Sequence, residues 1–223
     1  MIVAIDGPAA SGKSTVARAI AAHLGMAYLD TGAMYRALAV EALSRGVALD
    51  DAETLSEMAC ECVIRFSHAD GSGLPTHVAI DGMDVTAAIR TPVADKAVSP
   101  VSAVPGVRAA MVDQQRRISR EQENTVLEGR DIGTVVFPHA NLKIFLTASA
   151  EERARRRTLD MEARGANMTY DEVLADLRRR DEYDSNRSAS PLMKAQDAIE
   201  LDTTGMTIHD VVAFVEALVA ERR

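Results

Sequence analysis

The stretch Gly7-Pro8-Ala9-Ala10-Ser11-Gly12-Lys13-Ser14-Thr15 decides the fold of this chain. It matches the pattern G-x-x-x-x-G-K-[ST] and lies between a strand-like run, Ile2–Ile5, and a helical pattern, as this motif requires. The glycines let backbone N–H groups approach phosphates, and the N-terminus of the following helix adds its dipole. We expect Lys13 to reach the β- and γ-phosphates and the Ser14 hydroxyl to ligate Mg²⁺. The stretch therefore predicts a P-loop that binds a nucleotide.

Length and composition are typical of a globular protein. The 223 residues suffice for one large domain, or for a main domain with a small insert. Hydrophobic residues make up 47% of the chain and no run of about 18 apolar residues exists, so we expect a soluble protein without a membrane-spanning helix. The N-terminus has no basic region followed by an apolar stretch, which argues against a signal peptide.

The net charge limits the kinds of binding partner to expect, and the cysteine content indicates the cellular compartment. The net charge of -8 disfavours a general nucleic-acid binder. Cys60 and Cys62 are too few and too close together for a disulfide framework, so we expect a reducing, cytoplasmic location. The five histidines have no metal-ligand spacing, and a zinc site is not expected.

Apolar runs and helical patterns alternate along most of the chain. Five runs are predicted to be strands: Ile2–Ile5, Ala27–Leu29, Thr125–Leu127, Leu142–Thr147 and Ala198–Leu201. Six segments have a helical pattern: Ser14–Leu24, Ala33–Ser44, Val107–Arg120, Ala150–Ala163, Tyr170–Arg180 and Ile208–Ala220. This alternation predicts an α/β fold in which helices cover both faces of a parallel sheet.

One region, about residues 62–90, breaks this alternation. Three short runs in it alternate in the manner of strands: Val63–Phe66, His77–Ile80 and Met83–Val85. They surround two hairpin turn signals, Asp70-Gly71-Ser72-Gly73 and Asp81-Gly82. The region is therefore predicted to form a small antiparallel insert.

The P-loop alone does not identify a function, because motors, switches and kinases share it. A GTPase-type switch would carry an Asn-Lys-x-Asp guanine reader, and the sequence contains none. A motor ATPase usually has an apolar strand that ends in a metal-binding aspartate. Here Leu142–Thr147 ends in threonine, and Val126-Leu127-Glu128 runs into Gly129-Arg130-Asp131. The size of the chain and its single P-loop favour a small-molecule kinase.

Four further stretches carry a resemblance that is more specific than the P-loop. They are Asp30-Thr31-Gly32-Ala33-Met34-Tyr35-Arg36, Ser99–Arg108, Gly129–Thr134 and Arg180–Arg187. Together with the P-loop, their order and spacing resemble the bacterial cytidylate (CMP) kinases, from Ile2 to about Thr204. The resemblance implies a nucleoside-monophosphate (NMP) kinase fold with a five-stranded parallel sheet flanked by helices, a small antiparallel insert and a short lid.

The resemblance also implies a division of the chain into three regions. Residues 1–30, 107–152 and 188–223 would form the core that carries the P-loop. Residues 31–106 would form the NMP-binding region with its insert, and residues 153–187 would form the lid and the helices beside it. We expect this unit to act as a monomer.

Phosphoryl transfer to a monophosphate needs little general-base catalysis, because the attacking phosphate oxygen is already ionised near neutral pH. An arginine-rich acceptor site fits such a substrate. By resemblance, Arg36, Arg130 and Arg187 clamp the CMP phosphate, for which arginine forks are suited. Arg180 and Asp184 match the positions that hold the sugar hydroxyls. The residues alone favour another interpretation of these two, an i,i+4 pair on an exposed helix face.

Cytosine presents an amino donor at N4 beside acceptors at N3 and O2, and a carboxylate is the expected partner of N4. By resemblance Asp131 takes this role, Arg108 donates to the acceptor edge and Ser99 adds a hydroxyl contact. Uracil would place a carbonyl against Asp131, so discrimination is expected. Thr31 and Tyr35 would line the phosphate pocket, although a helix N-cap and a packed aromatic are alternatives.

Four arginines surround the segment that enters the expected lid, Leu159–Met168: they are Arg153, Arg155, Arg156 and Arg157. In the family one or two such residues close over the donor phosphates and exclude water, which prevents hydrolysis of ATP. Not all four can face inward from a helix. Arg153 and Arg157 are four residues apart on one face, so these two are favoured.

The sequence thus indicates an ATP:CMP phosphotransferase that uses Mg²⁺ and also accepts dCMP, with Lys13, Arg130, Arg153 and Arg157 as catalytic residues. Two alternatives remain open: a P-loop kinase that acts on another nucleoside monophosphate or a small metabolite, and a nucleotide-dependent switch without turnover. In the main interpretation Arg130 and Asp131 face different parts of one ligand instead of pairing with each other. The glycines beside them, Gly129 and Gly133, would give a nucleotide room to approach the backbone.

Overall fold

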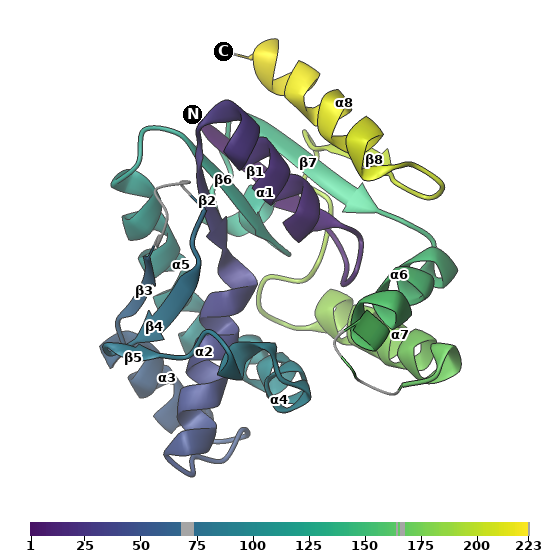
Figure 1. Ribbon diagram of the computed structural model, residues 1–223. Helices are drawn as coiled ribbons and strands as arrows, with labels where there is room; N and C mark the ends of the chain where they lie inside the picture. The colour runs from purple at the N-terminus through teal and green to yellow at the C-terminus, as the bar shows by residue number, and fades with distance from the viewer. Residues whose placement is uncertain (68–73, 164, 166–167, 223) are drawn as a thin grey trace.

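The computed structural model describes residues 1–67, 74–163, 165 and 168–222, and it contains one parallel sheet and one small antiparallel sheet (Figure 1). The parallel sheet has five strands: β1 (Ile2–Asp6), β2 (Ala27–Asp30), β6 (Thr125–Gly129), β7 (Leu142–Thr147) and β8 (Ile199–Asp202). Their order is β2-β6-β1-β7-β8, and every neighbouring pair is parallel. The predicted strands and the α/β fold are therefore confirmed.

Helices cover both faces of the parallel sheet, which is why its strands are apolar on both sides (Figure 1). The four that pack on it are α1 (Lys13–Leu24), α8 (Ile208–Ala220), α2 (Thr31–Ser44) and α5 (Pro105–Arg120). Val3 and Ile5 of the central strand pack against α1 and α8. Ala4, which points to the opposite face, belongs to a second core with α2 and α5. These two cores fix the sheet, so the loops at the carboxyl ends of its strands rest on a rigid base.

The small sheet is the predicted insert. Its strands, in the order β3-β4-β5, are β3 (Ile64–Ser67), β4 (His77–Ile80) and β5 (Met83–Asp84), and both pairings are antiparallel. Asp81 and Gly82 connect the last two strands with φ values of 50° and 83°, as a two-residue hairpin turn of type I′ requires. The other predicted turn, at residues 70–73, lies outside the described residues.

Several helical elements have no counterpart among the sequence predictions. They are α3 (Ala52–Glu61), α4 (Pro92–Ala103), the short 3₁₀ turn η1 (Ala88–Arg90) and the π-helical turn η2 (Ile132–Val136). In α4 the sequence signal is ambiguous because Pro100 lies inside the helix. Its start is marked instead by Thr91, whose hydroxyl accepts from Ala94 N at 3.3 Å, and by Pro92 at the first position.

Two helices, α6 (Ala150–Ala163) and α7 (Tyr170–Asn186), project from the carboxyl end of the sheet opposite α2 and α4 (Figure 1). They share a third apolar cluster in which Ala154, Val173 and Leu177 pack with Ala9 of the P-loop. α7 continues past Arg180, where the sequence prediction ended. Among the described residues, no helix is long and apolar enough to cross a membrane.

Candidate active site

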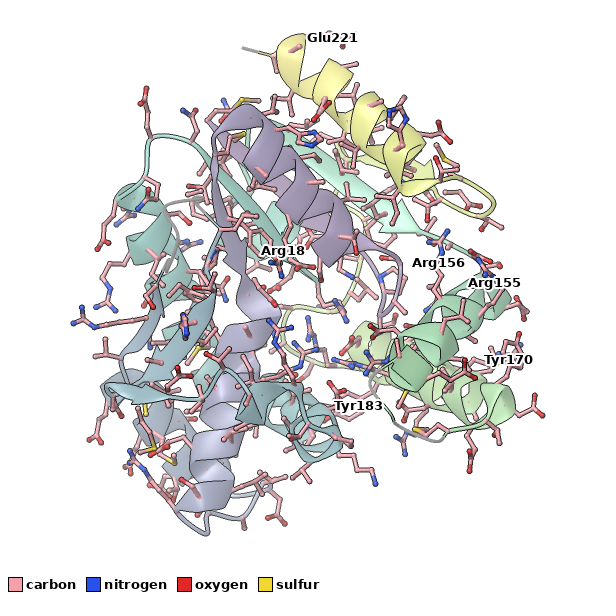
Figure 2. All side chains as sticks on the ribbon, viewed as in Figure 1. Arg18, Arg155, Arg156, Tyr170, Tyr183 and Glu221 are labelled. Atoms are coloured by element: carbon pink, nitrogen blue, oxygen red, sulfur yellow. The ribbon has the colours of Figure 1, made fainter. Side chains whose placement is uncertain are left out.

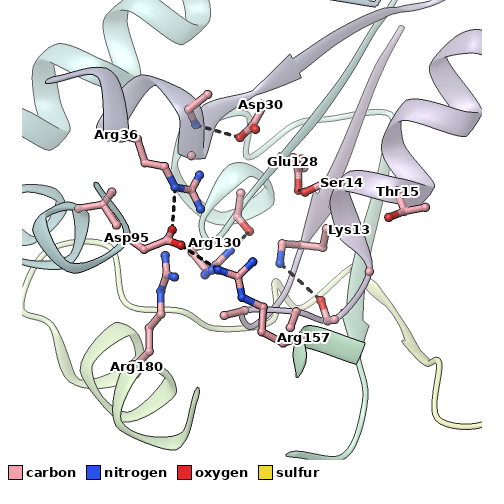
Figure 3. Close-up of a pocket in the computed structure, with 18 of the residues that line it drawn as sticks. Lys13, Ser14, Thr15, Asp30, Arg36, Asp95, Glu128, Arg130, Arg157 and Arg180 are labelled. Atoms are coloured by element: carbon pink, nitrogen blue, oxygen red, sulfur yellow. Dashed lines mark hydrogen bonds and ion pairs between the residues drawn. The ribbon is translucent and has the colours of Figure 1, made fainter. Parts of the chain in front are cut away.

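A cleft of about 1590 Å³ opens at the carboxyl ends of the parallel strands. One wall is formed by the P-loop and α6, another by α2 and α4, and a third by α7 (Figure 3). A pocket for one small ligand usually has a volume of about 300–1,000 Å³. The cleft therefore has room for two ligands side by side, and its position follows the general rule for open α/β sheets.

The P-loop turns sharply because its glycines adopt conformations that other residues avoid. Gly7 has φ +150°, and a Cβ on it would lie 2.0 Å from the carbonyl oxygen of Leu146 on β7. Gly12, with φ +94°, precedes α1 directly. Lys13 is buried, and its Nζ donates to the Pro8 carbonyl at 2.6 Å, so the ammonium group reaches back across the loop. Burial and then the charge of Arg130 hold the pKa of Lys13 well below its ordinary value.

Glu128, at the end of β6, faces the start of α1. The Ser14 hydroxyl donates to its Oε2 at 2.8 Å, and the Tyr28 hydroxyl donates to its Oε1. Burial and then the charge of Asp30 raise the pKa of Glu128. The sequence analysis gave Glu128 no role in the site, because its strand differs from the motor pattern by ending in Glu-Gly. The available signal was a carboxylate at the end of a buried strand, on the same sheet edge as the P-loop.

These residues are suited to Mg²⁺ rather than to a metal held by protein ligands alone. Among the described residues, no group of three or more His, Cys, Asp or Glu side chains could hold a metal ion. Mg²⁺ usually binds to one or two protein oxygens together with phosphates and water. The hydroxyl of Ser14 and the carboxylate of Glu128, 2.8 Å apart beside the P-loop, are hard oxygen donors of this kind.

Arg130 and Asp131 are adjacent in the chain but pair with different partners. Arg130 Nε lies 3.0 Å from Asp184 Oδ2, whereas the Asp131 carboxylate binds Arg108. Arg108 also donates to the Ser102 carbonyl at 3.0 Å and lies over the ring of Tyr35, 5.2 Å from its centre. Neither member of the Arg108–Asp131 pair is more than 6% exposed at its side chain. The two neighbours therefore belong to two separate clusters in one cleft.

The glycines beside this pair serve packing within the protein. A Cβ on Gly129 would lie 2.7 Å from Ile132 and 2.8 Å from the Thr31 hydroxyl. A Cβ on Gly133 would lie 3.1 Å from Lys143. We expected these glycines to leave room for a nucleotide. That expectation is wrong for the position that a Cβ would occupy, because other protein atoms already fill it.

Four arginines, Arg36, Arg130, Arg180 and Arg187, form an arginine cluster, and the Asp184 carboxylate lies beside three of them. Asp184 is 4% exposed, accepts from Arg130, and lies 3.8 Å from Arg187 Nη1. Burial acts to raise the pKa of Asp184, but Arg130, Arg180 and Arg187 outweigh it and lower this pKa. Burial, and then the charges of Arg130 and Arg36, lower the pKa of Arg180 to about 10. The alternative of an exposed i,i+4 pair between Arg180 and Asp184 is wrong, because the aspartate is buried and paired elsewhere.

Asp95 of α4 joins two arginines from different elements (Figure 3). Its Oδ1 lies 3.3 Å from Arg36 Nε on α2, and its Oδ2 lies 2.8 Å from Arg157 Nη2 on α6. A carboxylate between two guanidinium groups has the same sign of charge and the same acceptor geometry as a phosphate. Asp95, which the sequence analysis did not name, thus satisfies two cations of the cleft wall.

The arginines at the start of α6 point to different places. Arg153 is buried, and it donates to the carbonyls of Ala148 and Ala9 at 3.0 and 3.2 Å and pairs with Asp181 at 2.7 Å. Arg157 instead pairs with Asp95 of α4. The structure does not bring the guanidinium groups of Arg153 and Arg157 to one point.

Arg156 is the arginine of α6 nearest to the P-loop glycine. A Cβ on Gly12 would lie 3.8 Å from Arg156 Nη1, which donates to the Thr203 hydroxyl at 3.0 Å. Arg155, next to it in Figure 2, is 60% exposed at its side chain and pairs with Glu152 on the same helix. The sequence analysis listed Arg156 but favoured Arg153 and Arg157, because spacing along a helix does not say which face meets the loop.

Three more predicted residues line the cleft: Thr31, Tyr35 and Ser99. The Thr31 hydroxyl donates to the Glu128 carbonyl at 2.6 Å and so ties α2 to the end of β6. The N-cap of α2 is Asp30, whose Oδ1 accepts from Ala33 N at 2.9 Å, so the alternative that Thr31 is the cap is wrong by one residue. Tyr35 is buried beneath Arg108, and Ser99 is half-buried on α4.

Comparison with solved structures supports the fold. A gluconokinase from Sinorhizobium meliloti 1021 has a TM-score of 0.51 and 15% sequence identity to this chain, and the match covers 98% of this chain and 91% of that one. An uncharacterized protein from Eubacterium ventriosum ATCC 27560 has a TM-score of 0.54 and 13% identity, and it covers 100% of this chain. At such identities the likeness concerns the architecture alone.

Sequence relatives are much closer. A cytidylate kinase from Desulfitobacterium hafniense (strain Y51) is 50% identical over 210 residues, which are 94% of this chain and 88% of that protein. A cytidylate kinase from Geobacter sulfurreducens is 45% identical over 222 residues, 100% of this chain and 94% of that protein. A bifunctional pantoate ligase/cytidylate kinase from Synechococcus sp. (strain JA-2-3B'a(2-13)) is 50% identical, but the chain spans only 39% of its length.

The family model described as "Cytidylate kinase" matches residues 3–221, which is nearly the whole chain. This match includes the P-loop, the insert, the arginine cluster and the four helices that form the walls of the cleft. The chain belongs to the cytidylate kinase family.

Proposed function

We propose that this chain transfers the γ-phosphoryl group of ATP to CMP, and also to dCMP, with Mg²⁺ bound at the P-loop. The observation that carries the proposal is the buried Arg108–Asp131 pair, which lies in the same cleft as the arginine cluster and the P-loop. The Arg108 guanidinium offers hydrogen-bond donors and the Asp131 carboxylate offers acceptors, and the nearby arginines can bind a phosphate. This combination suits a nucleoside monophosphate. Membership of the family supports the same assignment.

The P-loop, Gly7 to Thr15, would hold the donor. Its backbone N–H groups would bind the phosphates, and the ammonium group of Lys13 would leave the Pro8 carbonyl to reach the β- and γ-phosphates. Mg²⁺ would be held by Ser14, with Glu128 beside it, and would neutralise the charge that develops on the phosphate oxygens. Lys13 and Arg130 would add positive charge on the remaining sides of the transferred group.

The arginine cluster would hold the phosphate of the acceptor. Arg36, Arg130 and Arg187 would donate to its oxygens, and the carboxylate of Asp95 would have to give up Arg36 when the phosphate enters. No general base is required, since an ionised phosphate oxygen is the nucleophile. The contribution of the protein is to align this oxygen with the γ-phosphorus and to exclude water.

The far end of the acceptor site would recognise the sugar and the base. Arg180 and Asp184 would bind the sugar hydroxyls, and Asp131 would accept from N4 of cytosine while Arg108 donates to N3 or O2. Uracil would face the Asp131 carboxylate with a carbonyl oxygen. Because two acceptors in a buried pocket repel each other and lose their water, discrimination of about 10⁴ or more is possible for such a mismatch.

The other predicted residues would complete the pocket. Thr31, Tyr35 and Ser99 would shape it from α2 and α4. Arg157 pairs with Asp95, which also holds Arg36, and Arg153 ties α6 to the P-loop, so the two arginines would align the lid helices with the site. The expected action as a monomer remains part of this proposal.

A coupled assay of ADP release with CMP, dCMP, UMP, AMP and shikimate as acceptors tests the proposal. We expect kcat/KM to be highest for CMP and dCMP, with no turnover after Mg²⁺ is chelated. A value for UMP or AMP equal to that for CMP would contradict the base recognition. ATP hydrolysis at a rate that no acceptor changes would contradict the kinase assignment as a whole.

A further inference from the structure

Asp6, the last residue of β1, holds the turn that follows a different strand, β6. Its Oδ1 accepts from Ile132 N at 2.8 Å, and its Oδ2 accepts from Gly133 N at 2.7 Å. The side chain is buried, with Asp6 only 5% exposed, and it lies below the cleft instead of in its lining. None of the substrate contacts proposed above uses it.

The two N–H groups that Asp6 binds are those at the start of η2. The first N–H groups of a helical segment have no acceptor within it, and an aspartate at the preceding position ordinarily supplies one with its own side chain. Asp131 occupies that position but makes no capping hydrogen bond. Its carboxylate binds Arg108 in the cleft. Asp6 therefore performs the capping that Asp131 would otherwise perform.

We propose that Asp6 is a positioning residue for base recognition: by capping η2, it leaves the Asp131 carboxylate free to face the base of the acceptor. Without Asp6, the side chain of Asp131 could turn back and accept from Gly133 N, away from the cleft. Asp6 does not touch the substrate and acts only through Asp131. This inference rests on the proposed function, because it concerns the discrimination of CMP from UMP.

The surroundings of Asp6 support a specific role for its charge. Burial raises the pKa of Asp6 to about 6 even though the hydrogen bonds from Gly133 and Ile132 lower it, so the ionised side chain is kept there at a cost. The charged groups near it are Asp131, which raises the pKa, and Lys13, which lowers it. The carboxylate packs directly against Gly133, since a Cβ there would lie 3.4 Å from Asp6 Oδ2, at contact distance.

The substitution Asp6→Asn tests the proposal. Asparagine keeps the shape but replaces one acceptor oxygen with an amino group that faces a backbone N–H, so one of the two capping bonds is lost. We expect the ratio of kcat/KM for CMP to that for UMP to fall about tenfold or more, while KM for ATP stays within about twofold. A crystal structure of the variant should show the Asp131 carboxylate moved from Arg108 towards Gly133 N.

A double-variant cycle shows whether Asp6 acts through Asp131. The variant Asp131→Ala alone should lose most of the discrimination, and adding Asp6→Asn to it should change the CMP-to-UMP ratio by less than about twofold. Asp51→Ala is the matched control. Asp51 caps α3 by accepting from Thr54 N at 3.1 Å on the surface, so its loss should lower Tm and leave the ratio unchanged.

An Asp6→Asn enzyme with a lower Tm and an unchanged CMP-to-UMP ratio would overturn the proposal, because Asp6 would then serve only the fold. Additive effects of the two substitutions would also overturn it. If Asp6→Asn gives too little folded protein, Asp6→Ser, which is smaller and retains one acceptor, takes its place with the same expected results. A wild-type enzyme without preference for CMP would instead contradict the proposed function, and the crystal structure would still show whether Asp6 directs Asp131.

Discussion

Replacing Arg180 by methionine should make the protein more stable and a poorer enzyme. Burial, followed by the charges of Arg130 and Arg36, lowers the pKa of Arg180 from its ordinary value to about 10. Asp184 and Asp95 oppose this lowering but do not cancel it. The guanidinium group is thus held close to the like charges of Arg130 and Arg36, the residues proposed to bind the acceptor phosphate. Methionine has a similar stem and no charge, so it fills the space without this repulsion.

The expected gain in the free energy of unfolding can be worked out from the lowered pKa of Arg180. Each pKa unit corresponds to about 1.4 kcal/mol, so the lowering of the Arg180 pKa to about 10 sets an upper limit near 3 kcal/mol. At pH 7, below both values, the side chain is charged in the folded and the unfolded states, so the full cost is present. Water in the open cleft screens part of it, and we expect a gain of about 1–2 kcal/mol. For a chain of this length, Tm rises by about 2–4 °C for each kcal/mol.

Calorimetric unfolding of the wild type and of Arg180→Met, with and without CMP, measures this effect. CMP should raise Tm less in the variant, because the phosphate no longer relieves a repulsion there, and kcat/KM for CMP should fall. Arg178→Met is the control: Arg178 is an exposed neighbour that pairs with Glu151 at 3.0 Å, and its loss should change stability by less than about 0.5 kcal/mol. A Tm of Arg180→Met at or below that of Arg178→Met would refute the reasoning.

Three further outcomes are expected. Asp131→Ala should raise KM for CMP and relax discrimination against UMP, whereas Arg130→Ala should lower kcat with every acceptor by about 10²–10³; steady-state kinetics that match the wild type, with only a lower Tm, would contradict both. Ser14→Ala should raise the Mg²⁺ concentration needed for half-maximal rate, which a Mg²⁺ titration at fixed ATP measures, and an unchanged titration would exclude Ser14 as a ligand. The carboxylate of Asp6 has an ordinary pKa of 3.8 and a folded value of about 6, so the folded state binds its proton more tightly. Relative to Asp6→Asn, the wild type should therefore lose unfolding free energy as the pH rises from 4 to 6 in denaturant titrations, and a constant difference would show that the pKa is not raised.

The predicted strands agree with the structure because local signals determine them. The alternation of apolar runs and helical patterns gives all five strands of the parallel sheet, and the Asp81-Gly82 turn joins β4 and β5 as its type requires. α4 was not predicted because Pro100 interrupts its pattern, and helix α3 has too short an apolar repeat to stand out. In both cases tertiary packing decides the conformation that the local pattern leaves ambiguous.

The candidate site also has a part that local sequence could predict and a part that it could not. For the P-loop, both the residues and the groups expected to bind phosphate could be predicted, because the motif specifies a backbone conformation together with its ligand. The resemblance indicated the residues of the acceptor site, but not their partners in the empty cleft. Nothing in the sequence places Glu128 beside Ser14 or Asp95 between Arg36 and Arg157, because these contacts join residues from separate elements.

The sequence by itself determined the sheet and the P-loop, since strand periodicity, glycine conformations and motif spacing are properties of neighbouring residues. The side chains proposed for the acceptor site came from the resemblance to a family. Only the tertiary structure decided that Arg130 pairs with Asp184 and Asp131 with Arg108. It also decided that Asp6 caps η2, the turn that follows Asp131 and precedes β7. The physical reason is that parallel strands end at one edge of the sheet, so carboxylates and arginines far apart in the chain meet there in a buried space, where each charge requires a partner.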